Sequence, residues 1–491
     1  MTSSSASLPR SAPSAQGVDA AGIDGLLDAV DTAGIELHSL MVLRHGHVVA
    51  EGWWAPYAPD LKHLVYSLSK TFTSAAAGLA IGEGRFGLDD RMVDHFPDLV
   101  PSDLDDRYSR YLVRHALSMS SGHEAEALDR AVEAAEGRGG DLLAGFFAVP
   151  PEREPGSVFA YNQPTVYGVG RLVARTTGGG LLAYLQPRLL DPLGIDEAQW
   201  MMIGDVEMGF SGLHLRTESL AKAGQLVLDG GRWGDEQILD PAWVATATSV
   251  QTRNDTGDRA PGGDEPIDWR QGYGFQYWMG RHGFRGDGAY GQFILVWPEE
   301  DAVVVTTAET VDMAGLLDLL TTHLVSAMSG SGAPEADAEL AERLAGLALA
   351  VPSDSGAPFE GEFEIVADAL PPGPFTSGGP VPGARSVAVV PRADGWSLRV
   401  RGADADVALP VGRGAWAAGE WPASADGLDA VPFRSSGGVA ADGSWHAELR
   451  MIQTPHTLLV DIEPGGPARL AWRYPPLRGD GPAGHALPHR V

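Results

Sequence analysis

The sequence has no cysteine, which excludes disulfides, thiolate nucleophiles and cysteine-ligated metals. It is also poor in lysine: of its 35 Lys+Arg residues, three are lysine, at Lys62, Lys70 and Lys222. Arginine serves equally well for solvation but cannot release its proton near neutral pH. A chain that uses arginine almost everywhere therefore has a chemical reason to keep lysine where a base is needed.

Long apolar runs and excess positive charge are missing too. No uninterrupted apolar stretch approaches the roughly 20 residues that span a bilayer, and residues 1–17 lack the apolar core of a secretory signal. The formal charge of −30 disfavours nucleic acid and anionic membranes as partners, because both repel it. We expect residues 1–17 to be a disordered tail on a cytoplasmic protein whose partner is a small molecule.

The length of 491 residues is too great for one compact core. A breaker run of Ser, Gly, Ala and Pro over residues 329–334 marks the predicted end of a first domain, residues 18–330, with a helical insertion at about 86–205. A linker with a helix follows at 331–357. Short strands between turns then predict an all-β domain, a sandwich or a barrel, over 358–476, before a tail at 477–491.

Hydrophobic patterning predicts the main elements. Helices are expected at 23–33, 74–81, 166–175, 217–228, 241–250, 314–328 and 337–350. Strands are expected at 40–43, 48–53, 292–297, 302–307, 386–390, 396–401, 445–452 and 458–462.

The most informative motif is Ser67-Leu68-Ser69-Lys70, which precedes the Ala-rich helix. At i, i+3 the hydroxyl and the amine share one helix face, and Ser67 falls in the first turn, where free backbone N–H groups favour an oxyanion. A second Ser-x-x-Lys, Ser219 to Lys222, lies in an ordinary amphipathic helix with Thr217 as its expected cap, and we interpret it as surface structure.

A serine nucleophile needs a base and commonly a second proton relay. Tyr161, in a turn before a helix, is the candidate relay, although tyrosine is more often a core residue. Gly286, Gly288 and Gly291 spell G-x-G-x-x-G, but they precede a strand rather than open a helix, which excludes a dinucleotide loop. We interpret these glycines as permitting a close backbone approach.

Several motifs, in order, resemble the serine β-lactamases and penicillin-recognising enzymes, in particular the class C-related branch with its esterases, D-aminopeptidases and amide hydrolases. They are Tyr66 to Ser74, Gly84 to Asp90, Arg114 to Gly122, Asp191 to Gly194, Ser211 to Leu213, and Asp287 to Gln292 with the hairpin that follows. The resemblance covers about residues 18–328. It implies an antiparallel sheet flanked by helices with an inserted helical subdomain, an α/β plus all-α fold, here followed by the C-terminal all-β domain.

The resemblance also implies a site. Ser67 is the expected nucleophile, Lys70 and Tyr161 the general base and acid, and the N–H groups of Ser67 and Ala289 the oxyanion hole. Gly288 and Asp287 are expected beside them, with no cofactor and no metal.

Two departures affect the substrate. The second motif is usually Tyr-x-Asn, whereas Gln163 stands at its third position, so either Gln163 or Asn162 is the expected substrate contact. The third motif usually begins with Lys or His, but Gly286 stands there, and a cation must come from Arg285 or His282 or be absent. This favours neutral esters, amides or short peptides over penicillin-type substrates.

Other functions find little support in the sequence. A Ser-His-Asp hydrolase would need a G-x-S-x-G elbow, which the sequence lacks. His485 and His489 have metal-ligand spacing, but Pro488 between them suits no helix. The alternatives that stay open are a weak or inactive binding protein on the same scaffold and a true β-lactamase or D-amino-acid peptidase. The sequence leaves the oligomeric state unknown.

Overall fold

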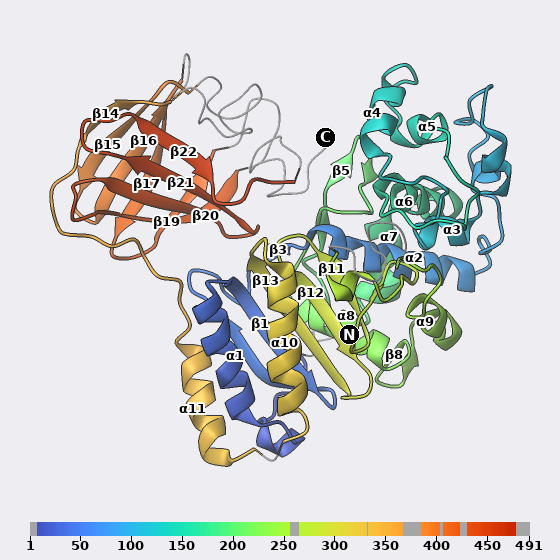
Figure 1. Ribbon diagram of the computed structural model, residues 1–491, viewed down its shortest axis with the longest axis horizontal. Helices are drawn as coiled ribbons and strands as arrows, with labels where there is room; N and C mark the ends of the chain where they lie inside the picture. The colour runs from blue at the N-terminus through green and yellow to red at the C-terminus, as the bar shows by residue number, and fades with distance from the viewer. Residues whose placement is uncertain are drawn as a thin grey trace.

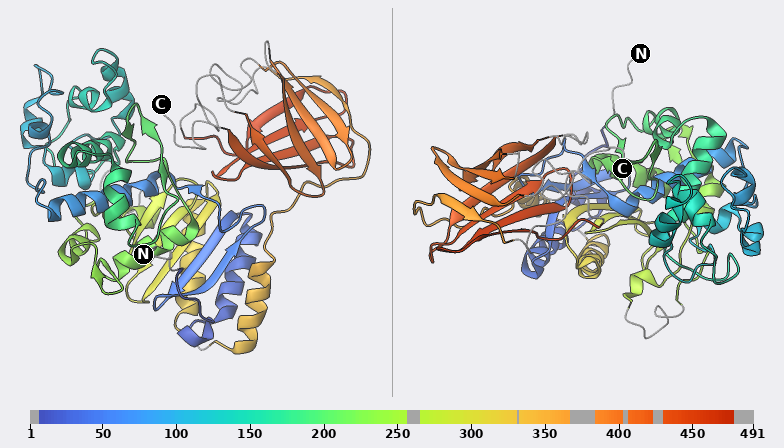
Figure 2. Two further views of the ribbon diagram at one scale, coloured as in Figure 1. Left: turned by 180° about the vertical axis from the view of Figure 1, so that it is seen from behind. Right: turned by 90° about the horizontal axis from the view of Figure 1, so that it is seen from above.

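A computed structural model describes residues 7–255, 265–330, 332–366, 384–402, 406–422 and 430–477 (Figure 1). A mixed sheet-and-helix body carries a helical subdomain on one side and a β domain on the other. Seen from above, these two attachments lie at opposite ends of the molecule (Figure 2). The predicted fold class is therefore confirmed.

The body is built on an antiparallel sheet with the strand order β10-β11-β12-β13-β1-β2. The first strand of its N-terminal hairpin pairs with residues 302–309, so the two ends of the body meet inside the sheet. The strands are β1 (Glu36–Arg44), β2 (His47–Trp53), β10 (Trp278–Met279), β11 (Phe284–Gly288), β12 (Gln292–Trp297) and β13 (Ala302–Glu309).

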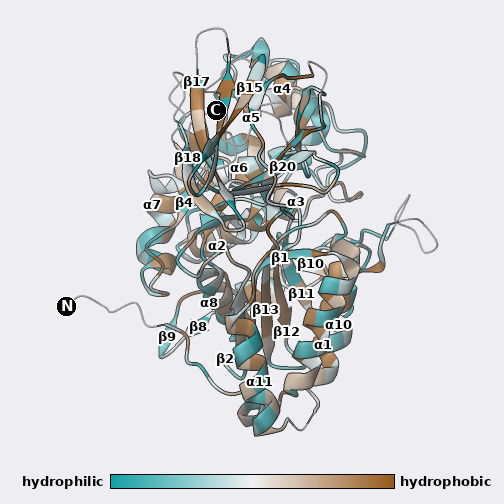
Figure 3. Ribbon diagram, turned by 90° about the vertical axis from the view of Figure 1, so that its left-hand side faces the viewer, coloured by the Kyte–Doolittle hydropathy of each residue, from teal (hydrophilic) through white to brown (hydrophobic). Residues whose placement is uncertain are grey.

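Both faces of this sheet are buried. Along β1, Met41 and Leu43 pack into one core, which continues into the helical subdomain, whereas Leu40 and Val42 pack into a second core on the opposite face. The central strands are accordingly apolar along their length (Figure 3), as expected for a sheet covered on both sides.

Different helices cover the two faces. Helix α8 (Thr217–Leu228) packs on β12, β13 and β1, while α1 (Ala20–Ala33), α10 (Met313–Ala327) and α11 (Pro334–Ala345) pack together on the other side. The helices beyond the sheet are α2 (Ser69–Gly82), α3 (Val113–Leu117), α4 (Leu128–Glu136), α5 (Leu142–Phe147), α6 (Gln163–Thr177), α7 (Leu181–Leu185) and α9 (Pro241–Ala247). Short strands link these parts: β3 (His63–Leu64), β4 (Gln199–Trp200), β5 (Met202–Ile203), β6 (Val206–Glu207), β7 (Leu213–Leu215), β8 (Arg232–Trp233) and β9 (Glu236–Gln237).

The C-terminal domain is one curled sheet whose strands pair antiparallel except for β17 and β19, which run parallel. Its path runs β14-β15-β16-β17-β19-β20-β21-β22, with β18 paired to β19, and an Ile365–Ala468 bridge brings its two ends together. Trp421, Trp445 and Phe433 are fully buried within it, so its interior is a packed core. The strands are β14 (Gly361–Glu364), β15 (Ser386–Arg392), β16 (Gly395–Arg401), β17 (Asp406–Arg413), β18 (Ala417–Trp421), β19 (Val431–Val439), β20 (Trp445–Met451), β21 (His456–Ile462) and β22 (Ala468–Trp472).

The expectation of a disordered tail over residues 1–17 is wrong for residues 7–17. Leu8 is buried and its N–H donates to Glu218 at 2.8 Å, and Arg10 forms ion pairs with Glu51 and Glu218. Residues 14–16 form a 3₁₀ turn. The Ser/Ala/Pro-rich composition did not predict this order, because only one apolar residue, Leu8, and one arginine, Arg10, hold the segment in place.

The other predicted domain boundaries stay predictions. The predicted helix at 217–228 is α8 with the same bounds, although Arg216, not Thr217, occupies its cap position. Within the part of the chain that the structure describes, no helix is both long and apolar enough to cross a membrane.

Candidate active site

Ser67 lies in a tight 3₁₀ turn, η2 (Tyr66–Leu68), which leads directly into α2. The hydroxyl of Ser69 donates to the Tyr66 carbonyl at 2.6 Å and accepts the N–H of Leu213 at 3.0 Å, which ties the turn to β7. Tyr66 has a φ of 48°, in the left-handed region. The turn thus holds Ser67 half-buried at the start of a buried helix.

The Lys70 amine lies one helical turn below Ser67. Its Nζ donates to Ser67 Oγ at 2.9 Å and to the Phe210 carbonyl at 2.7 Å, and the side chain is 1 % exposed. Burial lowers the pKa of Lys70 well below its usual value, while the carboxylates of Glu126 and Asp287 raise it. A lysine in this setting can lose its proton near neutral pH.

Tyr161 completes a cluster around these two side chains. Its ring lies 4.8 Å from Lys70 Nζ and stacks on Trp278 with centroids 5.3 Å apart. Burial raises the pKa of Tyr161, and a hydrogen bond with Ser67 opposes that shift. The structure therefore brings Ser67, Lys70 and Tyr161 together.

Strand β11 runs against the Ser67 turn, and its glycines make the contact possible. A Cβ on Gly288 would meet the Val65 carbonyl oxygen at 2.1 Å, and one on Gly286 would meet Thr71 Cγ2 at 2.8 Å. These two glycines lie inside β11 rather than before a strand, and what approaches them is the nucleophile turn itself. Any side chain at Gly288 would separate the strand from the turn.

Ala289 follows at the end of β11. It is half-buried, and its carbonyl accepts a hydrogen bond from the Gln292 side chain at 3.1 Å. The same Gln292 amide donates to the Ala308 carbonyl at 2.7 Å, so the turn after β11 is fixed to β13. Tyr290, the next residue, has a φ of 66°.

The structure separates the two candidates for the second-motif amide. Asn162 is fully buried: its Oδ1 accepts the Ala127 N–H at 3.1 Å and its Nδ2 donates to Ser121 Oγ at 3.4 Å. Gln163 is half-buried at the start of α6, and its Oε1 has no hydrogen-bond partner among the described residues. The Asn162 side chain is thus hydrogen-bonded within the helical subdomain, whereas the Gln163 amide oxygen has no such hydrogen bond.

The candidate cations of the third motif do not replace the missing lysine. Arg285 is buried, and its Nε donates to Asp287 at 2.9 Å while Nη1 donates to the Asp268 carbonyl at 2.8 Å. Its guanidinium also lies over the Trp269 ring, 4.6 Å from the centroid. His282 is exposed and lies 4.0 Å from Glu300. Arg285 is therefore paired with Asp287 and is not available to bind a substrate carboxylate.

Sequence reasoning missed three groups near the nucleophile. Glu126 and Trp278 belong to no recognisable motif. The folding of the helical subdomain and of β10 brings them near Ser67. The Phe210 carbonyl could have been found, because it directly precedes the Ser211 to Leu213 signpost.

The second Ser-x-x-Lys motif is built differently. Ser219 donates to Glu197 at 2.6 Å, and burial lowers the pKa of Lys222. Both side chains are 5 % exposed, since α8 packs on the sheet, so the interpretation as surface structure is wrong. Ser219 is engaged by a carboxylate rather than by the lysine.

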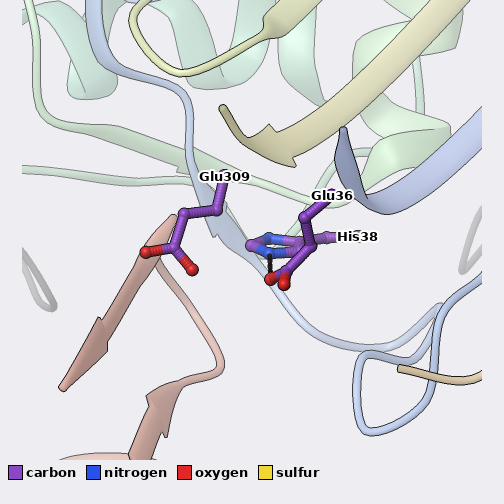
Figure 4. A group of neighbouring side chains, drawn as sticks. All are labelled: Glu36, His38 and Glu309. Carbon is purple, nitrogen blue, oxygen red and sulfur yellow. Dashed lines mark hydrogen bonds and ion pairs between the residues drawn. The ribbon is translucent and has the colours of Figure 1, made fainter. Parts of the chain in front are cut away.

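A further titratable cluster lies at the junction with the β domain. Glu36 and His38 are joined at 3.1 Å and face Glu309 (Figure 4). Arg450 and Arg473 from the β domain both form ion pairs with Glu36. A metal ion would have to displace these guanidinium groups, so the cluster fits a domain contact better than a metal centre.

Residues 23–202 match the protein-family model for Beta-lactamase. The predicted resemblance to the serine β-lactamases is therefore confirmed over this part of the chain.

The chain is also similar to two hydrolases. It is 25 % identical over 281 residues to 6-aminohexanoate-dimer hydrolase of Paenarthrobacter ureafaciens, a match covering 54 % of this chain and 71 % of that protein. It is 27 % identical over 184 residues to lovastatin esterase of Penicillium rubens, covering 34 % of this chain and 46 %, less than half, of that protein.

Among solved structures, a putative 6-aminohexanoate-dimer hydrolase from Bacillus anthracis matches with a TM-score of 0.52 and 18 % identity. The match covers 66 % of this chain and 87 % of that one. At this identity it supports the fold.

Proposed function

We propose that the protein is a serine hydrolase that cleaves an ester or amide bond through an acyl-enzyme on Ser67. The observation that carries the proposal is the 2.9 Å contact between a buried, pKa-lowered Lys70 amine and a half-buried Ser67 hydroxyl. An amine of this kind is a competent general base for a serine. The curated relatives, an amide hydrolase and an esterase by name, support the same class of reaction.

In the proposed mechanism Lys70 takes the Ser67 proton as Oγ attacks the carbonyl carbon of the substrate. The N–H groups of Ser67 and Ala289 stabilise the oxyanion, at the point where β11 meets the nucleophile turn. Tyr161, next to both Ser67 and Lys70, passes the proton to the leaving alcohol or amine. Water then attacks the acyl-enzyme with the same groups as base and oxyanion stabiliser, which frees Ser67 and the carboxylic acid product.

The substrate class follows from the charges around the site. Arg285, the basic side chain next to Gly286, is held by Asp287, so no cation replaces the third-motif lysine there. Glu126 acts on Lys70 electrostatically and disfavours an anionic substrate nearby. We therefore propose neutral esters, amides or short peptides, with Gln163 rather than Asn162 as the amide that contacts them.

The test is covalent labelling with a fluorophosphonate, followed by turnover of p-nitrophenyl esters, D-amino-acid amides and a chromogenic cephalosporin. We expect labelling and ester or amide turnover in the wild type, both abolished in Ser67→Ala. Ser219→Ala is the matched control and should behave as the wild type. Labelling that persists in Ser67→Ala would contradict the proposal, and absence of labelling in the wild type would favour a binding protein on this scaffold.

A further inference from the structure

The two residues next to the proposed oxyanion donors are tyrosines with left-handed backbones. Tyr66 (φ 48°) precedes Ser67, and Tyr290 (φ 66°) follows Ala289. A left-handed conformation costs a residue with a side chain roughly 1–2 kcal/mol, so the surrounding structure must hold it in place. The two rings meet edge to face, 5.4 Å apart, in a small buried cluster.

The hydroxyl of Tyr66 is held by the β domain. It lies 2.5 Å from Nε2 of His456, the first residue of β21. Nδ1 of the same imidazole lies 3.1 Å from the Tyr474 carbonyl, which can only accept a hydrogen bond, so Nδ1 carries a proton. In the neutral imidazole Nε2 is then an acceptor, and Tyr66 donates to it. The backbone of Leu477 also hydrogen-bonds this hydroxyl.

Tyr290 is held by the same part of the chain. Its hydroxyl donates to the Pro475 carbonyl at 2.5 Å, and its ring stacks on Tyr474 with centroids 6.4 Å apart and an 18° angle between planes. His456 also contacts the Tyr290 ring edge to face, at 5.2 Å. One imidazole and the short segment after β22 therefore bind both tyrosines.

Other hydrogen bonds and ion pairs between the β domain and the body surround the contacts of Tyr66 and Tyr290. Thr457, next to His456, donates through its N–H and its hydroxyl to Glu309, at 3.1 and 2.6 Å. Leu64 donates its N–H to the Gln453 carbonyl at 2.8 Å, just before the nucleophile turn. Arg473 forms an ion pair with Glu36 of β1.

We propose that His456 and the Tyr474–Pro475 segment are positioning elements of the active site: by holding Tyr66 and Tyr290, the β domain sets the two backbone N–H groups of the oxyanion hole. The inference rests on the proposed function and assigns a catalytic purpose to the C-terminal domain. None of these groups touches the reacting atoms. Their effect on the reaction passes through the backbone of Ser67 and Ala289, where a small displacement weakens stabilisation of the transition state more than binding of the substrate.

The experiment compares His456→Leu, Tyr66→Phe and the double variant in the full chain, with kcat and KM measured on the best p-nitrophenyl ester. Removing one oxyanion donor outright lowers kcat by about 100- to 1,000-fold, so loosening it should lower kcat by on the order of 10-fold with KM little changed. Both substitutions break the Tyr66–His456 hydrogen bond, so the loss of kcat in the double variant should be smaller than the product of the two single losses. His456→Gln, which keeps an acceptor for Tyr66, should recover most of kcat.

The matched control is His446→Leu, the same exchange in the same domain at a residue that pairs with Asp461. It should leave kcat unchanged. If His456→Leu does not fold, as judged by a cooperative thermal transition, Tyr290→Phe removes the bond to Pro475 with less disturbance and carries the same expectation.

The outcomes separate this inference from the function on which it rests. If Ser67→Ala loses fluorophosphonate labelling but kcat in His456→Leu, Tyr66→Phe and Tyr290→Phe stays within about twofold of the wild type, the positioning role is overturned and the hydrolase stands. The role is also overturned if the single effects multiply in the double variant. If labelling survives Ser67→Ala, the proposed function itself fails.

Discussion

The Glu126 carboxylate opposes the effect of burial on the Lys70 amine. Burial lowers the pKa of Lys70, and among the charges around it Glu126 raises that pKa most, ahead of Asp287. Glu126 is exposed on the segment before α4, whereas Lys70 is buried in α2. A surface carboxylate of the helical subdomain therefore helps to set the proton affinity of the proposed base.

Changing Glu126 should shift the pH profile. The neutral amine is the proposed base, so kcat/KM should rise with pH through the pKa of Lys70. Glu126→Gln removes a charge that raises this pKa, so the acidic limb should move to lower pH, and the move should be larger at low salt than at high salt. Glu124→Gln is the control, since Glu124 pairs with Arg153 and does not act on Lys70. A shift to higher pH would contradict the assignment of Lys70 as base.

Lys70→Arg should nearly abolish turnover although the positive charge is kept. Arginine does not release its proton, and losing general base catalysis lowers rates by about 100- to 10,000-fold. Measurement of kcat with the fluorophosphonate labelling rate checks this. Lys222→Arg, the same exchange in the second Ser-x-x-Lys motif, should keep wild-type kcat. Wild-type turnover in Lys70→Arg would mean that another group accepts the Ser67 proton.

Tyr161→Phe should distinguish the contribution of the aromatic ring from that of the hydroxyl. The ring still packs on Trp278 and beside Lys70 Nζ, so folding should be retained. Loss of the phenol removes the proposed proton donor to the leaving group, which should lower kcat by about 100-fold or more, most for amides with poor leaving groups. Comparing p-nitrophenyl esters with anilides of the same acyl group measures this. An equal loss on both would indicate that Tyr161 acts on Ser67 rather than on the leaving group.

Gly288→Ala should damage both stability and the site. The added Cβ would meet the Val65 carbonyl oxygen at 2.1 Å, and overpacking of this kind costs about 1–3 kcal/mol of unfolding free energy. Urea denaturation gives this change, and the labelling rate reports the displaced strand. Gly82→Ala, at the end of α2, has nothing within 4 Å of the new Cβ and should change stability by less than about 1 kcal/mol. Equal midpoints for the two variants would show that β11 can move away from the turn.

Local patterns in the sequence were sufficient to predict several of the elements and the proximity of Ser67 to Lys70. The 3.6-residue periodicity predicts α8 and a short apolar run predicts β12, each with its observed bounds, because α8 buries one face and β12 buries both. Ser67 and Lys70 lie one turn apart on the same segment, so their contact follows from helix geometry. Tyr161 needed the resemblance, since no local pattern connects it with Ser67.

The groups that the sequence could not reveal all depend on contacts between distant segments. His456 lies 390 residues from Tyr66, and nothing around it marks a partner. Glu126 affects Lys70 through space, across the fold of the helical subdomain. Residues 7–17 are ordered by Glu51 and Glu218, which belong to elements far along the chain.

The pairing of β1 with β13 has a consequence for the newly made chain. Glu36 lies opposite Glu309 and Arg44 opposite Ala302. During synthesis β1 therefore cannot pair with β13 until some 260 further residues have been made. During that interval the open edge of β1 exposes an apolar strand that other unfinished chains can join. Folding should accordingly be slow and should benefit from chaperones, and the helical subdomain should reach its native state before the sheet that supports it.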